Sequence, residues 1–335
     1  MSAATATRCV RAVLIGPGAR RALRSGAGGC VELAFGPGGY VRLGEHRVLL
    51  APARSPLGPL SILVSGLGRG DLVAGMPAAV AGEALLVGAL RVELADARAP
   101  APPRSIPLAP GWQAALATAL AVVAAAHAEL APGLAALAAG DLAGAVAQLA
   151  GRGDGLTPAG DDALAGFAAW RWAQRAPVAL SAHRCAPLGR DYLRCAERGE
   201  LPQPAAVVLQ AIRAGEPRTA ARRASRLAAW GATSGAALLW GLAAGGAETS
   251  RSMTHATPAR ERAGVAGKDL RERSGAPCVV DYPSDCAVSS PWIVRGSPAS
   301  TRSIAGIQRR AAPLPAPRFA VGVSKNVEKR RFISP

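Results

Sequence analysis

The chain has 335 residues, of which 50% are hydrophobic and 4% aromatic, and its formal net charge is +17. This length accommodates two ordinary domains, or one domain with a tail, with alanine, leucine and valine filling the core. The longest apolar run, residues 114–126, is shorter than the roughly 20 residues of a membrane-spanning helix, so we expect no membrane partner.

The cysteines and histidines show no spacing that is typical of a metal or cofactor site. The six cysteines form no CxxC motif and no paired Cys/His spacing, and they stand at Cys9, Cys30, Cys185, Cys195, Cys278 and Cys286. In a chain of this size, such cysteines are typical of reduced thiols in a cytoplasmic protein. We therefore predict a cytoplasmic location, no metal ion and no cofactor.

The positive charge is distributed unevenly. Residues 1–250 contain 24 arginines, no lysine and 16 acidic residues, which gives +8. Residues 251–335 contain 15 basic and 6 acidic residues, which gives +9. A basic patch on a folded face would favour a nucleic-acid partner. Because more than half of the excess lies in a segment without apolar periodicity, we expect no nucleic-acid partner, and only charge supports that alternative.

The first domain that we predict, residues 1–98, is β-rich and barrel-like. The segment CVELAFGPGGYVRLG contains two short apolar runs joined by a Gly/Pro turn, which predicts a hairpin. Further short strands separated by glycine and proline are expected in HRVLLAP, PLSILVSGL and EALLVGALRVELADA. The Pro-rich residues 99–111 are predicted to form a linker.

The early segment LIGPGARRAL has some features of a phosphate-binding glycine loop. It lacks the full glycine spacing, and hairpins follow it where a strand–helix–strand unit is needed. We therefore expect strands rather than a phosphate site throughout the first hundred residues.

The second predicted domain, residues 112–248, is α-helical, so the fold class is α+β. Its first part is helix-forming and is interrupted at Pro132 and Gly140. DDALAGFAAWRWAQ predicts a further helix that ends before Pro177. Three more helices are expected in AAVVLQAIRAG, PRTAARRASRLAAW and SGAALLWGLAAG.

Two of these helices contain a short internal echo. GDDALAGFAA (residues 160–169) and GAALLWGLAA (residues 235–244) share the pattern G-x-x-x-L-x-G-apolar-A-A, and a hydroxyl residue precedes each. The second glycine of each copy costs about 1 kcal/mol against alanine in a helix. A close helix crossing explains this glycine best. We therefore predict two helices whose N-termini converge on one place.

Residues 249–335 differ in composition from the rest of the chain. They contain lysine, scattered proline and serine, and no sustained helix or strand period. Such a segment cannot bury enough apolar surface to offset the entropy lost on ordering. We predict a disordered C-terminal tail, or a stretch that does not belong to the original reading frame, and assign it no function.

The most informative segment is GRGDGLTPAGDDALAGFAAW, residues 151–170. Its closely spaced glycines allow tight turns and let a ligand approach the main chain. Thr157 and Pro158 fit an N-cap and a first helical position, where free N–H groups favour anions.

Asp161 and Asp162 then fall in the first turn of the helix. Two carboxylates would repel a phosphate unless a cation such as Arg152 intervened, or they could hold an amide N–H group of a substrate. From the residues alone, two interpretations stay open: a substrate site, and a well-capped helix after a tight turn.

This segment resembles the G-x-G-x-GLTPSGDD-x-LAG signature of a bacterial family that includes the AllH-type subunit of oxamate carbamoyltransferase, from anaerobic allantoin breakdown. The matching positions are Gly151, Gly153, Gly155, Leu156, Thr157, Pro158, Gly160, Asp161, Asp162, Leu164, Ala165 and Gly166. Ala159 replaces the usual serine. GPLSILV (residues 58–64) and WGATSGAALLWGL resemble further family segments, so the resemblance covers about residues 1–246.

The resemblance implies carbamoyl transfer from carbamoyl phosphate to oxamate, giving oxalurate and phosphate. It implies a small anionic substrate and other protein subunits as partners. On this basis we hypothesise that Asp161 and Asp162 are catalytic. The hypothesis assigns substrate binding to Arg152, Gly153, Gly155, Thr157, Gly160, Thr233, Ser234 and Gly235.

The second family motif often carries a histidine and an aspartate where Ala232 and Ala237 stand in this chain. This departure favours the alternative that the chain is a non-catalytic ligand-binding or assembly subunit.

Overall fold

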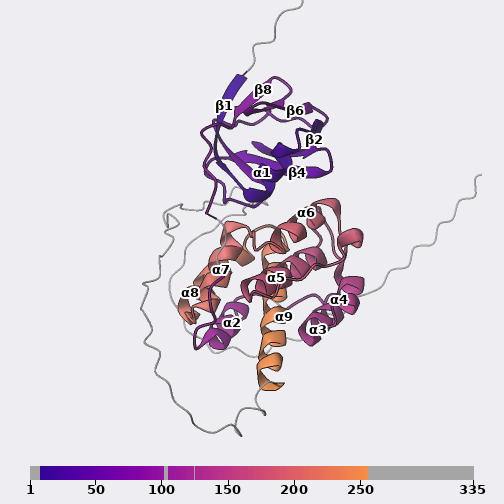
Figure 1. The fold of residues 1–335 in the computed structure, drawn as a ribbon, viewed down its shortest axis with the longest axis vertical. Coiled ribbons are helices and arrows are strands. Elements are labelled where there is room, and N and C mark those ends of the chain that lie inside the picture. Colours follow the sequence, from indigo (N-terminus) through magenta and orange to yellow (C-terminus); the bar gives the residue numbers. More distant parts are fainter. Residues whose placement is uncertain (1–7, 102–104, 124, 256–335) are drawn as a thin grey trace, which may run out of the picture. The chain divides into compact units, whose positions relative to one another are not determined.

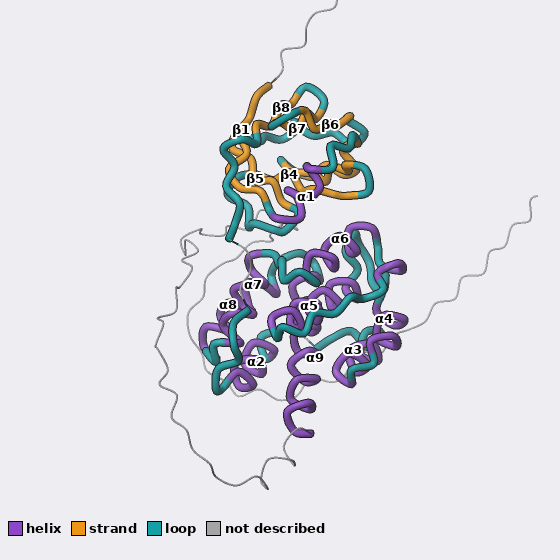
Figure 2. The backbone as a smooth tube through the Cα atoms, viewed as in Figure 1, coloured by secondary structure: helices purple, strands orange, loops and turns teal. Residues whose placement is uncertain are grey.

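The computed structural model describes residues 8–101, 105–123 and 125–255. The first part is a closed barrel with the strand order β1-β5-β4-β3-β2-β6-β7-β8 (Figures 1 and 2). The strands are β1 (Arg8–Ile15), β2 (Gly29–Phe35), β3 (Gly38–Leu43), β4 (His46–Pro52), β5 (Ser61–Ser65), β6 (Pro77–Ala81), β7 (Ala84–Val87) and β8 (Leu90–Glu93). The barrel closes because β1 pairs antiparallel with β5 and parallel with β8.

The predicted hairpin is confirmed as the β2–β3 pair. These strands pair antiparallel from Gly29↔Leu43 to Phe35↔Gly38. Gly36 in the turn has a φ of 51°, a left-handed conformation that glycine adopts without steric cost. Val41 and Leu43, two positions apart on β3, are both fully buried in the barrel core, as the two-residue period of a strand requires.

The expectation of strands alone in the first hundred residues is wrong at LIGPGARRAL. Residues Pro17–Arg24 form a short helix, α1, with proline in its first turn. Gly16 before it leaves no room for a side chain, because an added Cβ would clash with the carbonyl oxygen of Gly58. Close backbone packing inside the barrel domain therefore accounts for this glycine.

The second part of the described chain is helical, as predicted. It contains α2 (Trp112–Leu120), α3 (Ala131–Ala139), α4 (Leu142–Leu149), α5 (Ala159–Ala173), α6 (Pro187–Ala196), α7 (Gln203–Arg213), α8 (Pro217–Ala228) and α9 (Ser234–His255), with a short 3₁₀ turn at Ala182–Arg184. The predicted α+β class, a β-rich barrel followed by helices, is confirmed. None of these helices, within the described residues, is both long and apolar enough to cross a membrane.

Two helix boundaries differ from the prediction. Pro132 does not interrupt a helix but stands in the first turn of α3, where its missing N–H is not needed. The predicted low-order tail began at residue 249, whereas α9 continues to residue 255. Thr249 contributes to that helix, and its hydroxyl accepts a hydrogen bond of 3.0 Å from the Trp170 indole. Residues 256–335 of the predicted tail lie outside the described residues.

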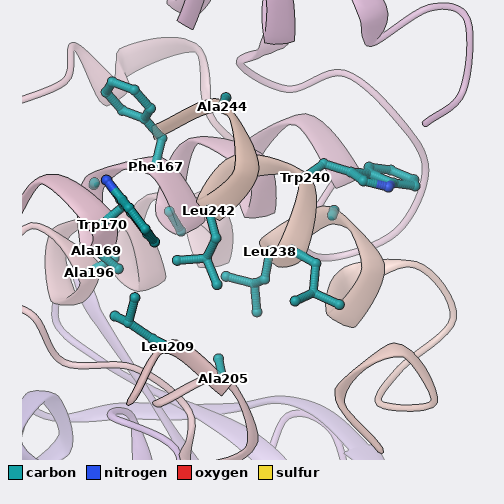
Figure 3. Packing of buried hydrophobic residues seen from close by; sticks show 14 of the residues in the cluster. Phe167, Ala169, Trp170, Ala196, Ala205, Leu209, Leu238, Trp240, Leu242 and Ala244 are labelled. Carbon is teal, nitrogen blue, oxygen red and sulfur yellow. The ribbon is translucent and has the colours of Figure 1, made fainter. Parts of the chain in front are cut away.

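The predicted close crossing of two helices is confirmed for α5 and α9. An added Cβ at Gly166 of α5 would clash with the Leu238 carbonyl, and one at Gly241 of α9 would clash with the Ala163 carbonyl. Figure 3 shows Trp170 of α5 beside the side chains of α9 in the buried cluster of this part. The crossing brings the starts of the two helices together.

Candidate functional site

The glycine-rich segment forms a tight loop between α4 and α5. Gly151, Gly153 and Gly155 have φ angles of 73°, 105° and 95°, in the left-handed region that favours glycine. Gly160, at the beginning of α5, packs so closely that an added Cβ would clash with the Leu149 carbonyl oxygen. These glycines therefore fix the path of the loop against the end of α4.

The start of α5 differs from the prediction that Thr157 is its N-cap. The helix begins at Ala159, and Pro158 occupies the cap position without a side-chain cap. The Gly160 N–H donates to the Arg152 carbonyl at 2.9 Å, and the Asp162 N–H donates to the Pro158 carbonyl at 3.1 Å. These two N–H groups of the first turn thus have acceptors within the chain.

Asp161 is 1% exposed, and both of its carboxyl oxygens hold backbone groups. Oδ1 accepts from the Gly151 N–H at 2.7 Å, and Oδ2 accepts from the Ala186 N–H at 2.8 Å. Burial raises the pKa of Asp161, while these hydrogen bonds and the charge of Arg190 oppose the rise. Asp161 therefore ties the glycine-rich loop to the start of α6.

Asp162 lies in a different environment, although it is the next residue. It is 6% exposed, and its buried Oδ2 has no hydrogen-bond partner in the described part of the chain. Burial raises its pKa to about 7, the negative charge of Asp161 adds to the rise, and hydrogen bonding from Ser234 and Thr157 opposes it. A carboxyl with such a pKa exists in both protonation states near neutral pH, so it can accept and return a proton.

Two hydroxyl groups complete this arrangement. Ser234 is the first residue of α9, and its Oγ lies 3.0 Å from the Thr157 Oγ1. Both hydroxyls are half-buried, and both lower the pKa of Asp162 through hydrogen bonds. The structure thus brings together three of the residues that the sequence singled out, from two segments about 75 positions apart.

The other predicted substrate-binding residues lie on the same loop and next to the start of α9. Arg152 is exposed on the loop, and its Nε donates to the Gln148 carbonyl at 3.5 Å. The Thr233 carbonyl accepts from the Ala237 N–H at 3.0 Å. Gly235 packs on the end of α8, where an added Cβ would clash with the Leu227 carbonyl. The roles assigned to these residues stay predictions.

Sequence reasoning missed two tyrosines that lie near Asp162. Tyr192 of α6 and Tyr40 of β3 are hydrogen-bonded to each other, and burial raises the pKa of both phenols. The charge of Asp162 acts on each of them in the same direction. Neither tyrosine stands in a recognisable motif, so only the folded chain reveals this neighbourhood.

A metal site needs several ligating side chains close together. Over residues 8–101, 105–123 and 125–255, no three His, Cys, Asp or Glu side chains are grouped so that they could hold a metal ion.

The fold and this site define an α+β protein in which a buried carboxyl and two hydroxyls meet where two helices begin. Residues 149–246 match the family described as oxamate carbamoyltransferase subunit AllH. The match contains both the glycine-rich segment and the start of α9, and it confirms the resemblance there. It is narrower than the expected 1–246, because the barrel lies outside it. No curated protein and no solved structure matches the chain.

Proposed function

We propose that the chain is a subunit of a carbamoyl-group transferase and that the group of Asp162, Thr157 and Ser234 is its substrate site. The observation that carries this proposal is the buried Asp162 carboxyl with one free oxygen, inside the residues that match the family. The reaction is the transfer of a carbamoyl group from carbamoyl phosphate to oxamate.

The overall reaction balances as follows. The amide nitrogen of oxamate becomes bonded to the carbamoyl carbon, and the bond from that carbon to the phosphate oxygen breaks. The nitrogen loses one proton, which Asp162 takes up and passes to the departing phosphate, so the products are oxalurate and hydrogen phosphate. A carboxyl with a pKa of about 7 suits both the uptake and the release of the proton, because its two protonation states have similar free energies at neutral pH.

The neighbouring residues have supporting roles in this proposal. Asp161 acts on the reaction by positioning, because its two oxygens hold the loop and the start of α6. Arg152, exposed on the loop, attracts the anionic substrate. The backbone at Gly153, Gly155, Gly160, Thr233 and Gly235 shapes the place where the substrate lies. Other protein subunits accompany this one in the enzyme, as the family's description as a subunit suggests.

A second candidate function is a non-catalytic ligand-binding or assembly subunit. The crossing of α5 and α9 is symmetric, because Gly166 meets Leu238 and Leu242, and Gly241 meets Ala163 and Phe167. Ala237 is fully buried at the position of α9 that corresponds to Asp162 of α5. Only one of the two equivalent positions therefore carries a carboxyl. This difference favours a subunit that binds a ligand without catalysing its reaction.

The test is a thermal-shift panel on the intact chain with carbamoyl phosphate, oxamate, oxalurate, phosphate and unrelated anions. A ligand that binds only the native state raises the melting temperature by mass action. We expect a selective rise that Asp162→Asn removes and that Asp154→Asn, at an exposed aspartate of the same loop, retains. Binding without oxalurate formation would support the assembly subunit, and no selective shift would contradict both candidates.

A further inference from the structure

We propose that Ser234 is a nucleophile that receives the transferred group as a covalent ester before the acceptor takes it. This inference rests on the proposed function, since it assigns the path of the carbamoyl group at the same site. It goes further by making a side chain of this protein a reactant.

The arrangement of side chains is that of an activated hydroxyl. The Ser234 Oγ lies 3.0 Å from the Thr157 Oγ1, and hydrogen bonding from these two hydroxyls lowers the pKa of the Asp162 carboxyl. A hydroxyl nucleophile needs a base within hydrogen-bond reach and a further group that fixes the geometry. Asp162 supplies the base, and Thr157 orients the hydroxyl.

Asp162 has the properties of such a base. Its side chain is more than nine-tenths buried, and its Oδ2 has no hydrogen-bond partner among the residues that the structure describes. One carboxyl oxygen is therefore left to receive a proton. Its pKa of about 7 supports this role, because it is close to that of the histidine that serves as the base in many hydrolases.

The position of Ser234 along α9 also favours attack on a carbonyl carbon. Ser234 is the first residue of a 22-residue helix. The N-terminus of a helix carries a partial positive charge, which stabilises the negative charge that develops on a carbonyl oxygen during attack. Thr157 lies before α5 rather than in its first turn, and its secondary hydroxyl is bulkier than that of Ser234. Both differences favour Ser234 as the nucleophile.

The two steps balance. In the first, Ser234 Oγ bonds to the carbonyl carbon of carbamoyl phosphate, the bond from this carbon to the phosphate oxygen breaks, and the hydroxyl proton passes through Asp162 to the phosphate. In the second, the acceptor nitrogen bonds to the same carbon and the bond to Ser234 Oγ breaks. The nitrogen's proton passes through Asp162 to Oγ, which restores the hydroxyl.

The decisive experiment treats the intact chain with a small fluorophosphonate, which esterifies activated serines and releases fluoride whatever their natural substrate. Peptide mapping by mass spectrometry locates the adduct. We expect one adduct, on Ser234, that is absent in Ser234→Ala and forms at least tenfold more slowly in Asp162→Asn. Ser225→Ala, at an exposed serine of α8, should label like the wild type. No adduct on Ser234, or an unchanged rate in Asp162→Asn, overturns the inference.

A parallel arm separates this inference from the proposed function. The chain is incubated with carbamoyl phosphate, quenched in acid and searched for a carbamoyl group on Ser234, with cyanate as the control for direct carbamylation. Labelling of Ser234 by the fluorophosphonate but not by carbamoyl phosphate would support Ser234 as a nucleophile and contradict carbamoyl phosphate as its substrate. If the Ser234→Ala variant forms oxalurate at the wild-type rate, the proposed function is supported and the covalent step is contradicted.

Discussion

The ionisation of Asp162 should make the protein less stable as pH rises through neutrality. The pKa of this carboxyl rises from 3.8 to about 7 on folding, mainly because it is buried. The native state therefore binds a proton that the unfolded state has released at intermediate pH. The contribution of this carboxyl to the free energy of unfolding is fully present below about pH 4 and is lost progressively as pH rises to about 7.

The magnitude follows from the two pKa values. At 1.36 kcal/mol per unit, a rise from 3.8 to about 7 corresponds to at most about 4 kcal/mol of stability over the whole range. Roughly 2 to 3 kcal/mol of this loss falls between pH 5 and pH 8. Burial raises the pKa of Asp161 and Asp191 as well, so they act with the same sign in the wild type.

The comparison with Asp162→Asn isolates the contribution of Asp162. The assay is urea unfolding of both proteins at several values between pH 5 and pH 8. We expect the variant to gain stability relative to the wild type as pH rises, by roughly 2 to 3 kcal/mol in total. The exposed Asp154→Asn should follow the wild type at every pH. An equal loss of stability in wild type and Asp162→Asn would refute the argument.

Three further predictions concern packing and buried polar groups. Gly166→Ala and Gly241→Ala should each destabilise by about 1 to 3 kcal/mol, since each added methyl meets backbone of the opposite helix. Gly28→Ala should not, because its added methyl would make only an ordinary contact of 3.5 Å with the Ala78 carbonyl oxygen. Asp161→Ala leaves the N–H groups of Gly151 and Ala186 without acceptors and should lower unfolding free energy by about 2 to 4 kcal/mol. Arg213→Met should be neutral or stabilising by about 1 kcal/mol, because burial alone lowers the pKa of this arginine to about 10 and its Nη1 has no acceptor among the described residues. Urea unfolding checks all three, and a loss above about 2 kcal/mol in Arg213→Met would contradict the last.

The close approach of α5 and α9 could be predicted because it leaves a mark in the sequence. A glycine in a helix interior is unfavourable, so its recurrence at equivalent positions of two apolar helices requires a reason. Gly166 and Gly241 supply that reason by letting the two backbones touch. From this contact the meeting of the two helix starts follows directly.

The helix α1 could not be predicted from the same kind of pattern. It has only eight residues, and Gly16 before it and Gly18 within it make close contacts with residues distant in sequence. An added Cβ at Gly18 would press on the Cys195 sulfur, for example. Tertiary contacts therefore account for this helix better than local propensity does.

The meeting of the two sequence motifs could be predicted from the sequence, but the two aspartates of the first motif could not be told apart. Successive residues of a helix point about 100° apart, so Asp161 and Asp162 meet different neighbours. The N–H of Ala186 before α6 reaches one, and the Ser234 hydroxyl at the start of α9 reaches the other. These neighbours come from distant segments, and the sequence carries no sign of which aspartate each one meets.

The role of Asp162 in carbamoyl transfer is best tested by measuring the oxalurate that wild type and Asp162→Asn form from carbamoyl phosphate and oxamate. We expect that the wild type forms oxalurate and that the variant, whose stability rises relative to the wild type as pH rises, loses turnover by about 10² to 10⁴-fold. Oxalurate formation at the wild-type rate in Asp162→Asn would contradict it.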